Sequence, residues 1–84
     1  MPVISRFDGI VIRIYFSQSE HDPAHIHVKF AEYSAVIGIE NNTILEGYLP
    51  NRELKKVKEW VLVHEEELLD IWNTQNFRKI EPLY

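Results

Sequence analysis

Three of the four histidines of this chain lie in one short segment, residues 21–28, which has the sequence His-Asp-Pro-Ala-His-Ile-His-Val. In a β-strand, side chains alternate between the two faces, so His25 and His27 project from one face while Ile26 and Val28 project from the other. Two imidazoles at this spacing suit metal binding, proton transfer or phosphate recognition. The segment is therefore the first candidate for a functional site.

Two kinds of chemistry stay open for the histidine pair. In the first, one of His25 and His27 acts as the general base and the other as the general acid, because imidazole exchanges protons near neutral pH. Arg13 or Lys29 would stabilise the charge that develops on a phosphorus centre, and Tyr15 would donate a hydrogen bond. This set of groups suits cleavage of RNA through attack by its own 2′-hydroxyl group, or RNA binding without cleavage.

The second kind is binding without catalysis, in which the same histidine cluster binds a metal ion or a protein partner. The candidate ligands are His21, Asp22, His25 and His27. His25, His27 and either His21 or Asp22 would hold zinc or another divalent cation and leave one position open to water. The chain contains no cysteine, so disulfides, thiolate nucleophiles and cysteine-based zinc sites are excluded. In the remaining alternative, the histidines are exposed strand residues with no functional role. Both an enzyme and a binding protein are compatible with the sequence.

Length and charge narrow the classes of function. The 84 residues suffice for one domain, 1–84, and a hydrophobic content of 45% supports an ordinary core. The net charge of −4 argues against binding of polyanions by the whole molecule, so contact with nucleic acid requires a local basic patch. No apolar run approaches the ~20 residues of a membrane span, and residues 1–5 lack a signal-peptide pattern. We therefore expect a cytoplasmic protein that does not contact the membrane.

The first half of the chain indicates strands joined by tight turns. Strands are expected at residues 3–7, 10–16, 25–30, 33–39 and 43–49. Asp8-Gly9 is typical of a type I′ hairpin turn, and Ala31-Glu32 and Asn41-Asn42 are further turn candidates. Gly47 interrupts the last strand, so its faces stay unassigned. The short connections favour an antiparallel meander of four to five strands.

One long helix is expected after the strands, from an N-cap at Asn51 to about Asn73. Its apolar stripe consists of Leu54, Val57, Val61, His64, Leu68 and Trp72, broadened by Trp60 and Ile71. His64 lies within this stripe, so we expect a hydrogen-bonded histidine of the core that takes no part in the site. The apolar residues of the tail, residues 77–84, indicate a short extended segment packed on the domain.

Together these elements predict an α+β fold in two layers, in which the antiparallel meander sheet packs on one long C-terminal helix. The helix covers the apolar face of the sheet and leaves the other face open. If the second and third strands pair, the open face carries a patch of cations and imidazoles. Its expected members are Arg13, Tyr15, His25, His27 and Lys29. Edge strands also lead us to expect that a homodimer can form.

Much of the chain resembles one small bacterial family, domain of unknown function 4160. The similar segments are residues 2–16 (PVISRFDGIVIRIYF), the histidine segment 21–28, Leu45-Glu46-Gly47 and residues 79–83 (KIEPL). Members commonly have two prolines before the first histidine of the pair, where this chain has Pro23-Ala24. Their genes often lie beside a second short family of unknown function, as in toxin–antitoxin pairs. The resemblance therefore implies a two-gene module with a small protein partner encoded nearby, and it supplies no catalytic residue.

Overall fold

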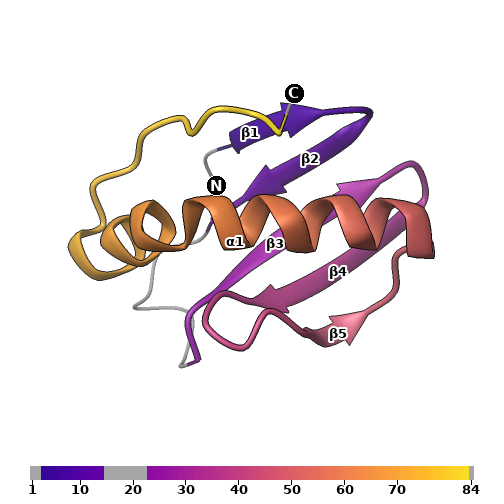
Figure 1. The fold of residues 1–84 in the computed structure, drawn as a ribbon, viewed down its shortest axis with the longest axis horizontal. Helices are drawn as coiled ribbons and strands as arrows, with labels where there is room; N and C mark the ends of the chain where they lie inside the picture. Colours follow the sequence, from indigo (N-terminus) through magenta and orange to yellow (C-terminus); the bar gives the residue numbers. More distant parts are fainter. Residues whose placement is uncertain (1–2, 15–22, 84) are drawn as a thin grey trace.

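A computed structural model describes residues 3–14 and 23–83, in which five strands form one sheet and one helix crosses it (Figure 1). The elements are β1 (Val3–Phe7), β2 (Ile10–Arg13), β3 (His25–Phe30), β4 (Tyr33–Gly38), β5 (Ile44–Gly47) and α1 (Asn51–Thr74). The sheet is antiparallel throughout, and its spatial order β1-β2-β3-β4-β5 follows the chain. The predicted α+β meander on one long C-terminal helix is confirmed.

Residues with positive φ close the turns between neighbouring strands. Asp8 and Gly9 have φ values of 51° and 77°, as a type I′ hairpin turn requires. Ala31, between β3 and β4, has a φ of 53°, and Asn42, between β4 and β5, has a φ of 52°. Asparagine tolerates this conformation but alanine seldom adopts it, so the pairing of β3 with β4 must impose it on Ala31.

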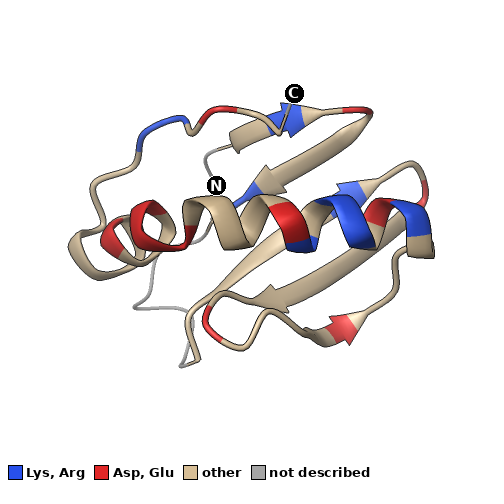
Figure 2. Ribbon diagram, in the orientation of Figure 1, with Lys and Arg blue, Asp and Glu red and all other residues tan. Residues whose placement is uncertain are grey.

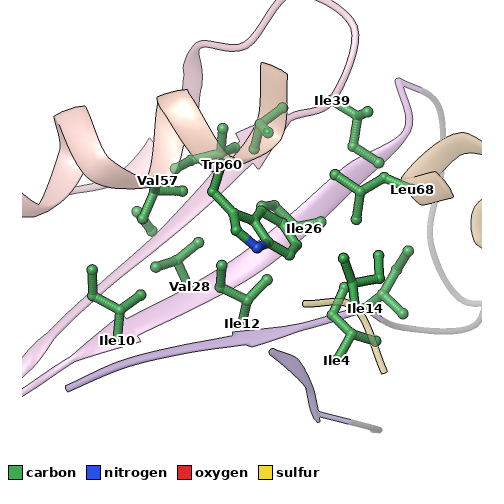
Figure 3. Close-up of a cluster of buried hydrophobic side chains, with 14 of the residues drawn as sticks. Ile4, Ile10, Ile12, Ile14, Ile26, Val28, Ile39, Val57, Trp60 and Leu68 are labelled. Carbon is green, nitrogen blue, oxygen red and sulfur yellow. The ribbon is translucent and has the colours of Figure 1, made fainter. Parts of the chain in front are cut away.

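The core lies between the sheet and α1, and Trp60 lies within it. Figure 3 shows the Trp60 indole among aliphatic side chains such as Ile12, Ile26 and Leu68. These four side chains have no exposed surface. Trp60 therefore belongs to the centre of the core rather than to the margin of the helical stripe. No helix in the described residues is long and apolar enough to cross a membrane.

The expectation that Asn51 caps α1 is wrong. Asn51 is already the first helical residue, and Pro50 is the cap, with extended backbone (φ −57°, ψ 148°) and no capping hydrogen bond from its side chain. The carbonyl of Pro50 accepts the first helical hydrogen bond from the amide of Leu54, at 2.9 Å. The helix ends at Thr74, one residue beyond the prediction, and Gln75 closes it in the left-handed conformation.

His64 borders the core and is hydrogen-bonded, as predicted. Its Nδ1 atom donates to the Glu67 carboxylate at 2.7 Å, and its ring centroid lies 5.3 Å from that of Trp60. The backbone of α1 departs from helical geometry at this residue (φ −112°, ψ 19°). Because α1 covers one face of the sheet, His64 lies in a different layer from the open face that carries His27.

The C-terminal tail returns along β1 in an extended conformation, as predicted (Figure 1). The amide of Ile80 donates to the carbonyl of Ile4 at 2.7 Å, and the side chain of Ile80 is buried. The indole Nε1 of Trp60 donates to the carbonyl of Glu81 at 2.9 Å. The tail is thus attached both to the first strand and to the centre of the core.

Candidate functional site on the open sheet face

The strand register aligns a row of four side chains across the sheet face that α1 leaves open. Arg13 of β2 lies opposite His27 of β3, which lies opposite Val36 of β4. Val36 lies opposite Glu46 of β5. Paired residues in an antiparallel sheet point to the same face, so a cation, an imidazole, an isopropyl group and a carboxylate follow one another across four strands.

A second row runs parallel to the first and adds two cations. Arg6 of β1 lies opposite Val11 of β2, Val11 opposite Lys29 of β3, and Lys29 opposite Ser34 of β4. Figure 2 shows the resulting distribution, with Lys and Arg on β1, β2 and β3 and an acidic position on β5. The two rows together form what we call the outer patch, made of Arg6, Val11, Arg13, His27, Lys29, Ser34, Val36 and Glu46.

Within the described residues, no ion pair joins Arg6, Arg13 or Lys29 of the outer patch to a carboxylate. In residues 3–14 and 23–83, the ion pairs join Lys56 to Asp8, His64 to Glu67 and Arg78 to Asp70. None of them involves Arg13 or Lys29. Although the chain as a whole is acidic, the outer patch carries the three cations Arg6, Arg13 and Lys29 against the one carboxylate of Glu46, so its described residues present net positive charge to an anion.

A hollow of about 280 Å³ lies over the outer patch. Its polar lining comes from Arg13, His27, Lys29, Ser34 and Glu46, and its apolar lining from Val28, Ala35, Val36 and Gly47. Two cations that bind anions, an imidazole that exchanges protons and a carboxylate that accepts them thus surround one hollow. This arrangement can hold a phosphate group between strands β2 and β5.

His25 lies close to His27 but does not line the hollow. Its side chain is buried, with 8% of its surface exposed, and its ring centroid lies 5.2 Å from that of His27 and 5.0 Å from that of Trp72. Nδ1 of His25 is 2.9 Å from the carbonyl oxygen of Pro23. A carbonyl only accepts hydrogen bonds, so Nδ1 carries the proton and the lone pair of the neutral ring is on Nε2.

Of the site residues predicted from the sequence, the structure brings Arg13, His27 and Lys29 together around the hollow. Tyr15, His21 and Asp22 lie outside the described residues, so their contributions stay predictions. Within the described residues, no group of three His, Asp or Glu side chains is arranged to hold a metal ion. The zinc prediction includes His21 and Asp22 and likewise stays a prediction.

Glu46 is the charged residue of the hollow that the sequence did not identify, because Gly47 left the faces of its strand unassigned. Consecutive residues Val36 and Ile37 of β4 lie opposite Glu46 and Ile44, so Leu45 is an extra residue and forms a bulge. Gly47 has a φ of 86°, and a Cβ atom there would lie 2.8 Å from Cα of Ala35 and closer still to the carbonyl oxygen of Ser34. A glycine within a strand signals such a bulge, although it does not reveal which face the neighbouring side chain takes.

Comparison with known proteins identifies a family but no activity. The model of a family described as Domain of unknown function (DUF4160) matches residues 9–73 of the 84. No curated protein and no solved structure gives a significant match. The matched region includes β2 to β5 and almost all of α1, and with them every residue of the outer patch except Arg6. The chain therefore belongs to the DUF4160 family.

Proposed function

We propose that this chain binds single-stranded RNA through the outer patch and acts in the cytoplasm as one component of a two-gene module of the toxin–antitoxin kind. The observation that carries the proposal is the pairing of Arg13 with His27, beside Lys29, around a hollow on the open sheet face. Arginine and lysine bind phosphate oxygens through charge-assisted hydrogen bonds. An open sheet face is also a surface that is well suited to splayed single strands.

The dimensions and the charge distribution favour this ligand. The two rows of the outer patch are two residues apart along the strands, or about 7 Å, so successive cations can contact successive parts of one backbone. Val11 and Val36, both half-buried, supply apolar surface between the charged residues for ribose or base contacts. Asp and Glu on the second half of α1 repel nucleic acid from that part of the surface, whereas the first half of α1 also carries Lys and Arg (Figure 2).

Binding is tested with a short fluorescent 2′-O-methyl RNA, which the chain cannot cleave through a 2′-hydroxyl group. In fluorescence anisotropy, Arg13→Ala and Lys29→Ala should each raise Kd by about tenfold, the equivalent of one charge-assisted hydrogen bond. Arg52→Ala is the matched control, because Arg52 is an exposed arginine on α1, in the other layer. Equal Kd values for the wild type, Arg13→Ala and Lys29→Ala would refute the proposal.

The outward side of α1 is the surface that we assign to the protein partner of the module. Leu62 and Val63 are both 67% exposed there, and exposed Glu59 and Glu66 flank them at helical spacing. A basic partner with an apolar centre matches this surface. Expression of this chain alone should slow growth, co-expression of the adjacent gene should restore it, and Leu62→Ser/Val63→Ser should prevent both the rescue and the co-purification of the two proteins.

A second candidate function is metal binding by His25 and His27 with His21 or Asp22. It is favoured by the hydrogen bond between Nδ1 of His25 and the Pro23 carbonyl, because metal-ligating histidines usually donate their other ring N–H in this way. Elemental analysis of untagged protein, purified without a metal column, tests it. Near-stoichiometric zinc that is lost in His25→Ala/His27→Ala, with a Tm that a chelator lowers, would establish the site. A metal-free wild type would refute it.

A further inference from the structure

We propose that the hollow cleaves RNA, with Glu46 as the general base and His27 as the general acid. The inference rests on the proposed RNA binding and adds a reaction and a catalytic residue, Glu46, to it. In this assignment Arg13 and Lys29 hold the phosphate group. The substrate is an RNA phosphodiester with a 2′-hydroxyl group beside it.

The distance between His27 and Glu46 across the sheet suits an acid and a base on opposite sides of one phosphate group. His27 and Glu46 are two strand spacings apart, which is about 10 Å between their Cα atoms, and Val36 lies directly between them. Both side chains rise from the same face and line the same hollow. A displacement at phosphorus has its attacking and leaving oxygens roughly in line, so its base and acid must stand on opposite sides of the phosphate. His27 and Glu46 meet this requirement with Val36 as the floor.

His25 cannot replace Glu46 as the partner of His27. The two imidazoles are in edge contact, so they lie on the same side of any phosphate bound in the hollow. His25 is also buried and packed against Trp72. We therefore assign His25 as a positioning residue, whose ring supports that of His27.

The backbone of β5 presents Glu46 to the hollow. The bulge at Leu45 shifts the register by one residue, and this places Glu46 opposite Val36 on the open face. The close approach of Gly47 to β4 then holds this register, since no other residue fits there without displacing Ser34 and Ala35. Bulges that direct a side chain towards a site are common beside active sites.

The reaction balances without a co-reactant. The Glu46 carboxylate accepts the proton of the ribose 2′-hydroxyl group, and the 2′-oxygen forms a bond to the adjacent phosphorus. The bond between phosphorus and the 5′-oxygen breaks, and the His27 imidazolium gives its proton to that oxygen. Arg13 and Lys29 stabilise the added negative charge on the non-bridging oxygens. The products are a 2′,3′-cyclic phosphate and a 5′-hydroxyl end.

The test compares cleavage of an end-labelled RNA with binding of the 2′-O-methyl RNA. The wild type should release fragments with 2′,3′-cyclic phosphate ends, identified by mass. Glu46→Gln should lower the cleavage rate at least about a hundredfold and leave the Kd for 2′-O-methyl RNA unchanged or lower. Glu32→Gln, at an exposed position in the turn between β3 and β4, is the matched control and should cleave normally.

A modified substrate separates the roles of the two groups. With sulfur in place of the 5′-oxygen, the leaving group needs no proton, so His27→Asn should regain cleavage while Glu46→Gln should not. Circular dichroism verifies that both variants are folded. Binding without cleavage, or normal cleavage by Glu46→Gln, would overturn this inference and leave the proposed function standing. Failure of the wild type to bind 2′-O-methyl RNA would overturn both.

Discussion

The imidazole rings of His25 and His27 lie 5.2 Å apart, yet their surroundings differ. His25 is buried against Trp72 at the C-terminal end of α1, whereas half-buried His27 lines the hollow on the open sheet face. One strand thus places one histidine in contact with the helix and the next in contact with solvent. The two rings should therefore respond differently to substitution.

We expect His25→Ala to lower the free energy of unfolding by about 1–3 kcal/mol, because it removes a buried ring and its hydrogen bond to the Pro23 carbonyl. His27→Ala should have a smaller effect on stability, because its side chain is half-exposed. It should have a larger effect than His25→Ala on the rate of RNA cleavage. Urea denaturation of both variants measures the difference. Equal losses of stability would show that the burial of His25 is not what sets the two residues apart.

Gly47→Ala should destabilise the protein by about 2 kcal/mol or more, because a side chain at a φ of 86° is strained and its Cβ atom would overlap the backbone of β4. Gly9→Ala is the matched control. Gly9 also has positive φ, but the nearest atom to its Cβ would belong to the Phe30 ring, at 3.4 Å. We expect a loss of about 1 kcal/mol there. A larger loss for Gly9→Ala in thermal unfolding would contradict the role given to Gly47.

Trp60→Phe should loosen the C-terminal tail, because phenylalanine cannot donate to the Glu81 carbonyl. Amide hydrogen exchange at Ile80 should become faster, while exchange within β3 should change little. Trp60→Ala should cost about 3–5 kcal/mol of stability, since it removes a fully buried indole. Leu62→Ala serves as the control for stability, because Leu62 is 67% exposed. Unchanged amide exchange at Ile80 in Trp60→Phe would argue against attachment of the tail through the indole.

RNA affinity should fall with salt concentration, and each cation of the outer patch should account for part of the slope. Lys29→Ala should reduce the slope of log K against log[salt] by about 1, because one phosphate contact is lost. Lys55→Ala, at an exposed position on α1, should leave the slope unchanged. Titration of 2′-O-methyl RNA at several salt concentrations measures both variants. An unchanged slope for Lys29→Ala would place the bound phosphates elsewhere.

The fold was predictable where alternation and turn residues agree. Alternating apolar residues in β2 and β3 indicated both strands and their faces, and Asp8-Gly9 indicated the hairpin that joins β1 to β2. Their pairing then placed Arg13 opposite His27. The cap of α1 was less predictable, because Pro50 and Asn51 are both common at helix starts and differ by only one position.

The site was predictable only in part, for two physical reasons. A period of two places His25 and His27 on one face but does not show that the end of α1 would cover the first of them. The bulge in β5 breaks the same period, so the face of Glu46 depends on its pairing with β4. The burial of His25 and the face taken by Glu46 both arise from contacts between elements. The residue pattern within one strand therefore does not predict them.

The order of the elements along the chain has a consequence for synthesis on the ribosome. Every strand pairs with its neighbour in sequence, so the whole meander can assemble before α1 has been made. During that interval its isoleucine-rich face is open to water and to other nascent chains. Burial of this face by α1 begins with Val57 and Trp60 and is complete only when Ile80 reaches Ile4. Binding of that transient face by a chaperone would therefore delay closure of the core without obstructing the strands.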